Sequence, residues 1–129
     1  MDFPKDLKYT QNDEWVRVQG NSAMIGITDY SQNQLSDIVF VEIIVAVGEQ
    51  VKQGDSCATV ESVKAAADVY MPVSGKITAI NEGLPDSPET LNSDPYGSAW
   101  MVQVEIANPA EAAELMDAAA YQANVESRE

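Results

Sequence analysis

Hydrophobic and polar residues alternate along the first part of the chain in the pattern typical of short β-strands. Segment 14–18 alternates, Gly20-Asn21 follows as a turn signal, and a second apolar segment occupies 23–27. These features predict a β-hairpin. The polar stretch 28–35 predicts a short helix that begins at Thr28 or Asp29, since both residue types cap helix N-termini.

The middle of the chain predicts further strands around a central lysine. The long apolar run 37–47 predicts a buried strand. Strands are then expected at 56–63, 65–71 and 76–81, separated by glycine-containing turns. Gly54 lies ten residues before Lys64 and Gly75 eleven residues after it. This near symmetry predicts a hairpin with two similar arms and Lys64 at its tip.

The last third of the chain changes from strands to helices. A proline-containing loop is expected at 83–97, followed by a strand at 99–106. Asn108 precedes Pro109, and Glu111 follows three residues after the cap, which predicts a helix start. A second helix is expected from Ala118 to about Val125. Short strands followed by terminal helices favour a mainly β fold, a small sandwich or barrel with helical appendages about 108–127, in a single domain 1–129.

Composition narrows the possible chemistry. The 129 residues contain 7 basic and 21 acidic side chains, a formal net charge of −14, with no histidine and one cysteine, Cys57. Without histidine there is no Ser-His-Asp or Cys-His nucleophile, and the usual ligands of a zinc site are missing. A single cysteine forms no internal disulfide. The sequence predicts no catalytic residue and no metal site, and we read Cys57 as a small buried residue.

Charge and hydropathy also bear on partners and location. The acidity disfavours nucleic acid and anionic membranes, which would repel this chain, and suits a basic docking face on a protein. No segment has the roughly 20 apolar residues of a membrane span. The N-terminal residues lack a signal or transit pattern, so we expect a cytoplasmic monomer.

Lys64 is the residue whose context suggests chemistry. A lysine at a hairpin tip is in most proteins a solvated surface charge. Here the flanking residues, Ala65 and Ala66, are small and leave the amine accessible to a modifying enzyme. A group attached at this point could swing between several active sites.

The sequence resembles the H protein of the glycine cleavage system over nearly its whole length. Six separate matches occur in the family's order, which is far more specific than one motif. The strongest is Glu61-Ser62-Val63-Lys64-Ala65-Ala66-Ala67-Asp68-Val69-Tyr70 with Pro72-Val73-Ser74-Gly75; the others are Leu7-Lys8-Tyr9, Glu14-Trp15-Val16, Gly26-Ile27-Thr28-Asp29, Asp37-Ile38-Val39-Phe40-Val41-Glu42 and Asn92-Ser93-Asp94-Pro95-Tyr96.

The resemblance implies a barrel-sandwich hybrid of the lipoyl and biotinyl type and a carrier without catalysis of its own. Lys64 would bear lipoate as an amide, within the recognition segment formed by Glu61, Ser62, Val63 and Ala65. A pyridoxal-phosphate glycine decarboxylase would load an aminomethyl group, a tetrahydrofolate-dependent aminomethyltransferase would remove it, and a flavin dihydrolipoamide dehydrogenase would reoxidise the arm. A lipoate ligase or transferase would attach the cofactor, and the cofactors would supply the chemistry.

The resemblance also implies a cleft that protects the loaded arm. The cargo ends in a protonated amine, which carboxylates can hold while water is excluded. By position, these carboxylates are Glu14 and Asp68.

We expect the aromatic residues Trp15, Phe40 and Trp100, all on predicted strands, to lie in the core.

Four features depart from the family pattern. Asp13 stands where histidine usually precedes Glu14, and Ser36 stands where glycine usually precedes Asp37. Ala99 replaces a glycine, and the loop 43–48 is one residue longer than usual. None touches the lysine hairpin, but Asp13 could alter arm docking, and the longer loop could alter partner contacts.

Other readings remain open. The chain could be an H-like paralogue that relays lipoate to other acceptors, or a lipoyl domain of a 2-oxoacid dehydrogenase-type complex. Such domains are shorter, carry Asp-Lys at the tip and follow Ala/Pro-rich linkers, whereas Val63 precedes Lys64 here. A biotin carrier would have methionines beside the lysine. An unmodified acidic interaction domain is the remaining alternative.

Overall fold

The computed structural model describes residues 1–128 as nine strands and several short helices. The strands are β1 (Lys8–Tyr9), β2 (Glu14–Gln19), β3 (Ser22–Ile27), β4 (Ile38–Ile43), β5 (Gln50–Val51), β6 (Ser56–Ser62), β7 (Ala66–Tyr70), β8 (Gly75–Ile80) and β9 (Val102–Ile106). The helices are α1 (Asp29–Leu35), a 3-10 turn η1 (Leu84–Asp86), α2 (Thr90–Ser93), α3 (Pro109–Ala113) and α4 (Ala118–Arg128).

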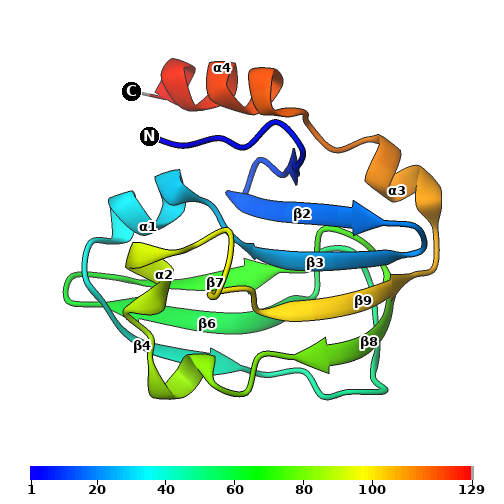
Figure 1. Ribbon diagram of the computed structural model, residues 1–129, viewed down its shortest axis with the longest axis horizontal. Helices are drawn as coiled ribbons and strands as arrows, with labels where there is room; N and C mark the ends of the chain where they lie inside the picture. The colour runs from blue at the N-terminus through cyan, green and yellow to red at the C-terminus, as the bar shows by residue number, and fades with distance from the viewer. Residues whose placement is uncertain (129) are drawn as a thin grey trace.

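The strands form two antiparallel sheets. Six strands make one sheet in the order β1-β2-β3-β9-β8-β5, and three make the other in the order β4-β6-β7. Figure 1 shows the two sheets with α4 and the N-terminal segment at one end of the molecule. The mainly β fold class predicted from the sequence is therefore confirmed.

The turns predicted around Lys64 depend on glycines with special geometry. Gly54 has φ +93°, a conformation that L side chains rarely adopt. At Gly75 a Cβ atom would collide with the carbonyl oxygen of Glu105 on the neighbouring strand β9. Backbone bonds between Gly54, Asp55 and Met71 join the two arms below the hairpin.

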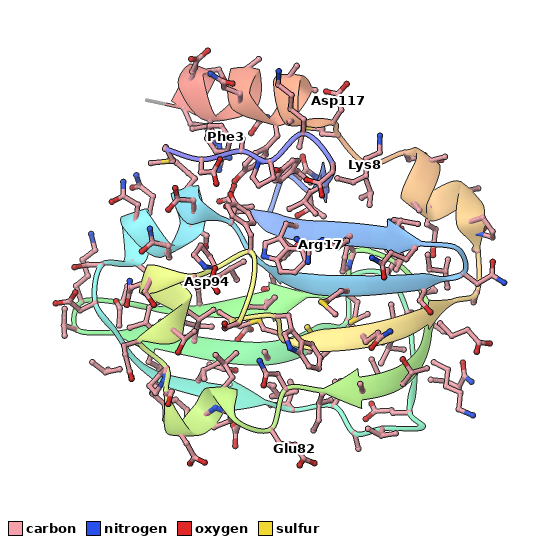
Figure 2. All side chains as sticks on the ribbon, in the orientation of Figure 1. Phe3, Lys8, Arg17, Glu82, Asp94 and Asp117 are labelled. Atoms are coloured by element: carbon pink, nitrogen blue, oxygen red, sulfur yellow. The ribbon has the colours of Figure 1, made fainter. Side chains whose placement is uncertain are left out.

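The core has two parts. The larger part fills the space between the sheets with aliphatic side chains such as Ile25, Val60 and Ile77. The smaller part lies under α4, where the rings of Tyr9 and Tyr121 stack 4.6 Å apart. Figure 2 shows Phe3 beneath α4, where its ring meets the edge of Tyr121. This second cluster fixes α4 against the start of the chain.

Four expectations from the sequence are wrong. The strand predicted over 37–47 ends at Ile43, and the loop expected at 83–97 contains η1 and α2. Phe40 is 44% exposed rather than buried, and Trp100 is only half-buried. The register of β4 against β6 shifts between Ile38 and Phe40, and such a bulge redirects side chains of an edge strand. Trp15 and Cys57 are fully buried, as predicted.

No helix within residues 1–128 is both long enough and apolar enough to cross a membrane.

Candidate functional site

Lys64 lies at the tip of the hairpin between β6 and β7. The last cross-strand pair is Glu61 with Ala66, and the chain reverses over the residues between them. Lys64 and its neighbours Val63 and Ala65 are exposed. In Figure 1 this turn forms the left-hand edge of the molecule. The hairpin therefore presents Lys64 at a solvent-exposed edge of the protein.

The side chain of Ser62 closes the turn. Its hydroxyl accepts hydrogen bonds from the N–H groups of Lys64 (3.3 Å) and Ala65 (3.0 Å) and lies 3.2 Å from the Ala65 carbonyl oxygen, to which it donates. The Ser62 N–H also donates to that carbonyl, at 2.7 Å. A second tether comes from outside the hairpin, because the Val63 N–H donates to the Asp37 carbonyl at 3.0 Å. The tip is thus a fixed point despite its exposure.

A cavity of about 210 Å³ lies beside the hairpin. Its walls come from the segment before β2 with the first residue of β2, the end of β3, helix α1, and parts of β6 and β7. The lining residues are Asn12, Asp13, Glu14, Ile27, Ser31, Gln34, Leu35, Val60, Ala67, Asp68 and Val69. The two carboxylates predicted as the cleft, Glu14 and Asp68, therefore line one cavity.

Glu14 is held rigidly inside the protein, with only 2% of its surface exposed. Its carboxylate accepts hydrogen bonds from the Thr10 hydroxyl (2.6 Å) and from the Tyr70 N–H on β7 (3.1 Å). Burial raises the pKa of Glu14 to about 7, against the lowering effect of these two hydrogen bonds, and the charge of Asp13 raises it further. A nearby cation would favour the ionised form.

Asp68 differs from Glu14 in its surroundings. It is exposed on β7, opposite Thr59 in the strand register, and the Thr59 hydroxyl lies 3.4 Å from one of its carboxylate oxygens. Besides Asp13, the cavity therefore has two carboxylates of different surroundings, the buried Glu14 and the exposed Asp68 on the hairpin. A cationic group carried by a chain attached at the tip could meet both.

The C-terminal helix holds Asp13, a contact that the sequence analysis did not identify. Arg128 binds the Asp13 carboxylate with a shortest distance of 2.7 Å, and the Tyr121 hydroxyl donates to the same carboxylate at 2.9 Å. Asp13 also has φ +68°, which non-glycine residues seldom adopt. The sequence offered no local signal, because Arg128 lies 115 residues away.

A second cavity, of about 480 Å³, lies on the other side of Glu14. Asn12 and Glu14 line both cavities, while the larger one is also lined by residues 9–11, the turns near Gly54 and Pro72, Tyr70 of β7, and residues of α3, of α4 and of the segment between them. Glu14 therefore stands in the wall between two solvent-accessible spaces.

Cys57 has no part in this chemistry. Its thiol is buried in β6, and burial raises its pKa to about 12. Because the thiolate is the reactive form, the thiol is inert near neutral pH.

A rigid, exposed lysine hairpin on a β-sandwich, beside a small acidic cavity, defines a carrier protein of the swinging-arm class. Comparisons with known proteins specify the family. The family model described as glycine cleavage H-protein matches residues 7–128.

Individual relatives agree with this match. A glycine cleavage system H protein of Carboxydothermus hydrogenoformans is 52% identical over 119 residues, covering 92% of this chain and 91% of its own. One from Salinibacter ruber is 53% identical over 121 residues, covering 94% and 97%. The crystal structure of a glycine cleavage system H protein from Mycobacterium marinum superposes with a TM-score of 0.85 at 34% identity, covering 95% of this chain and 98% of that one.

The chain belongs to the glycine cleavage system H protein family. It is a lipoyl carrier, a non-catalytic component of the glycine cleavage system, and members of this family carry lipoyllysine. The resemblance stated from the sequence motifs is thereby confirmed.

Proposed function

We propose that Lys64 is the residue that carries lipoate, joined as an amide to its side-chain nitrogen. The observation that supports this most directly is the tip geometry: Lys64 is exposed, its turn is closed by Ser62, and its neighbours Val63 and Ala65 are exposed as well. Glu61, Ser62, Val63 and Ala65 form the recognition segment around it. Attachment converts the amine to a neutral amide and leaves the protein one unit more negative.

We propose further that the 210 Å³ cavity holds the amino end of the loaded arm. Asp68 lies four residues from Lys64, at most about 13 Å even if the chain between them were fully extended, which is within reach of a lipoyl-lysine side chain. Glu14 and Asp68 would bind the protonated amine, while Ile27, Leu35 and Val60 supply apolar walls that limit water. Lipoate itself supplies the dithiolane sulfurs that bear the cargo.

The partner enzymes follow from the family. We propose that a pyridoxal-phosphate glycine decarboxylase loads the arm, a tetrahydrofolate-dependent aminomethyltransferase takes the one-carbon unit, and a flavin dihydrolipoamide dehydrogenase reoxidises the dithiol. A lipoate ligase or transferase modifies Lys64. The monomeric state, the cytoplasmic location and the single-domain organisation stay predictions.

Intact-mass measurement tests the attachment site. In a host supplied with lipoate, the wild-type protein should gain one lipoyl amide, and Lys64→Ala should gain none. Lys76→Ala is the matched control, since Lys76 is an exposed lysine on β8, and it should be modified like the wild type. A biotin adduct, or lipoylation that persists in Lys64→Ala, would contradict the assignment.

Reconstitution tests the carrier role. Lipoylated protein mixed with a glycine decarboxylase should support glycine-dependent release of carbon dioxide. A protein that is lipoylated but inactive in this assay, yet donates lipoate to other acceptors, would instead be a relay paralogue.

Two further variants test the cleft. Glu14→Gln and Asp68→Asn should shorten the lifetime of the aminomethyl-loaded form, because each removes one carboxylate that faces the amine. If the lifetime is unchanged in both variants, the cleft lies elsewhere.

A further inference from the structure

The only ion pair within residues 1–128 joins the C-terminal helix to the edge of the cleft. One guanidinium nitrogen of Arg128 lies 2.7 Å from Asp13 Oδ1, and the other lies 3.2 Å from Oδ2. This is a two-pronged contact, which fixes the orientation of the carboxylate as well as its position. The Arg128 guanidinium also lies 5.0 Å from the centre of the Tyr30 ring on α1. Arg128 therefore links α4 to Asp13 and to α1, and both Asp13 and α1 line the cleft.

A chain of hydrogen bonds continues from Asp13 into α1. The Tyr121 hydroxyl donates to Asp13 Oδ1, so its oxygen is free to accept from the Thr28 hydroxyl 2.7 Å away. Thr28 in turn caps α1, accepting from the Ser31 N–H, and its own N–H donates to the Asp13 carbonyl. Burial raises the pKa of Tyr121, which keeps this hydroxyl protonated. The position of Asp13 is thus over-determined, consistent with its strained φ.

The charges around Glu14 are otherwise negative or neutral. On its own segment it faces Asp13, and β7 contributes Asp68 and Tyr70. The larger cavity is also lined by Glu111 of α3, by Glu114 at the C-terminal end of α3, and by Tyr9 of β1. Cys57 of β6 lies near enough to feel the Glu14 charge.

Neither cavity is lined by a lysine or arginine of residues 1–128. The structure ties one cation to this site, because Arg128 forms an ion pair with Asp13 of the cavity lining. Without it, Asp13 would place an uncompensated negative charge beside a buried carboxylate, and like charges at short range disfavour ionisation.

We infer that Arg128 and Asp13 form a matched charge pair that sets the electrostatic field at Glu14, and thereby the pH range over which the cleft binds a protonated amine. The second part of this inference, the pH range of amine binding, rests on the proposed function of Glu14. The first part, the electrostatic field at Glu14, does not. Both are positioning residues, because neither Arg128 nor the paired Asp13 carboxylate has to touch the arm. The helix α4 thus contributes to the chemistry of the cleft from outside it.

The test is the titration of Glu14 in the unmodified protein, followed by ¹³C NMR of the side-chain carboxyl group and assigned from the peak that Glu14→Gln removes. Three variants are compared: Arg128→Gln, Asp13→Asn and the double variant. Asparagine tolerates positive φ, and glutamine is a good helix former, so both substitutions suit the local backbone.

The two single variants should shift the Glu14 pKa in opposite directions. Arg128→Gln leaves the Asp13 charge uncompensated, so the Glu14 pKa should rise by roughly half a unit. Asp13→Asn removes that charge, so the Glu14 pKa should fall by a similar amount. The double variant loses one charge of each sign, so its Glu14 pKa should lie between those of the two single variants. A pair with a merely structural role would give the same direction in both single variants, because both lose the same contact; that result, or no shift in Arg128→Gln, would overturn the inference.

A second measurement links the pair to the cleft. In lipoylated protein, the pH profile for retention of the aminomethyl group should move with the Glu14 pKa, upward in Arg128→Gln and downward in Asp13→Asn. If the pKa shifts occur while Glu14→Gln retains the cargo as long as the wild type, the charge pair stands and the proposed role of Glu14 fails. If the profile does not follow the pKa shifts although Glu14→Gln shortens retention, the second part of the inference is wrong.

Discussion

The hydroxyl group of Ser62 accepts a hydrogen bond from the Ala65 N–H at 3.0 Å, across the turn that carries Lys64. It also accepts from the Lys64 N–H and donates to the Ala65 carbonyl. The serine side chain here accepts the N–H hydrogen bonds that a backbone carbonyl accepts in an ordinary turn. One half-buried serine therefore sets the geometry of the turn that presents Lys64.

Replacing this hydroxyl should slow the attachment of lipoate. Ser62→Ala removes the bonds that fix the tip, so we expect kcat/KM for lipoylation to fall several-fold, with a loss of only about 1 kcal/mol in the free energy of unfolding. Ser62→Thr keeps the hydroxyl and should be modified at nearly the wild-type rate. Lipoylation is followed by intact mass, and mobility of the tip by amide exchange at Ala65. Equal rates for the alanine variant and the wild type would show that the modifying enzyme orders the turn itself.

Ser36 has an unfavourable backbone conformation that glycine would relieve. Its φ of 72° with ψ of −151° is a region that only glycine occupies freely. We expect Ser36→Gly to stabilise the protein by about 1 kcal/mol, because the strain relieved exceeds the added entropy of the unfolded chain. Urea denaturation measures the change. The control is Ser127→Gly within α4, which should destabilise by up to about 1 kcal/mol.

The sequence predicted correctly the strands, turns and helix caps that depend on local signals. Strand alternation, the turn at Gly54 and the caps at Thr28 and Asn108 are encoded within a few residues, and the structure has them. The motif around Lys64 predicted the family, which the comparisons confirm. The strands β1 and β5 were missed, since two residues carry no periodicity.

The expectations that failed concern residues whose burial or contacts depend on partners distant in the chain. Phe40 reads as a core residue in an apolar run, but the three-stranded sheet leaves its side of β4 open to solvent. Glu14 reads as an ordinary surface acid without the family, yet it is buried, and its carboxylate accepts a hydrogen bond from Tyr70, 56 residues away. The pairing of Asp13 with Arg128 likewise arises only when α4 packs on the N-terminal segment. Tertiary packing, not local propensity, decides these cases.

Apolar side chains near the tip should aid recognition by the lipoate-attaching enzyme. Before modification there is no arm, so this enzyme must bind the protein surface around Lys64. Val63 is 66% exposed, and its N–H is bonded to Asp37, which leads into the exposed pair Val39 and Phe40 on β4. Burying such side chains in an interface contributes favourably.

We expect Val39→Ser and Phe40→Ser each to raise the KM for lipoylation several-fold with little change in stability. Val18→Ser is the matched control, because Val18 is an exposed valine on β2 of the other sheet. It should be lipoylated like the wild type. If all three variants have the wild-type KM, the enzyme reads only the hairpin itself.

The buried Glu14 should make the protein less stable as pH rises from about 4.5 to 7. Its pKa is about 7 in the folded protein and near its ordinary 4.5 in the unfolded chain, so between these values the folded state holds a proton that the unfolded state has lost. The stabilising contribution is complete below pH 4.5 and is lost as pH rises through 7. At about 1.4 kcal/mol per pKa unit, the full effect is of the order of 3 kcal/mol. In Glu14→Gln this dependence should vanish, so the free energy of unfolding of the variant relative to the wild type should improve steadily across this interval. Urea denaturation at several pH values measures the free energy of unfolding, with Asp68→Asn as the exposed carboxylate control. If the difference between Glu14→Gln and the wild type stays constant with pH, Glu14 is ionised throughout this interval.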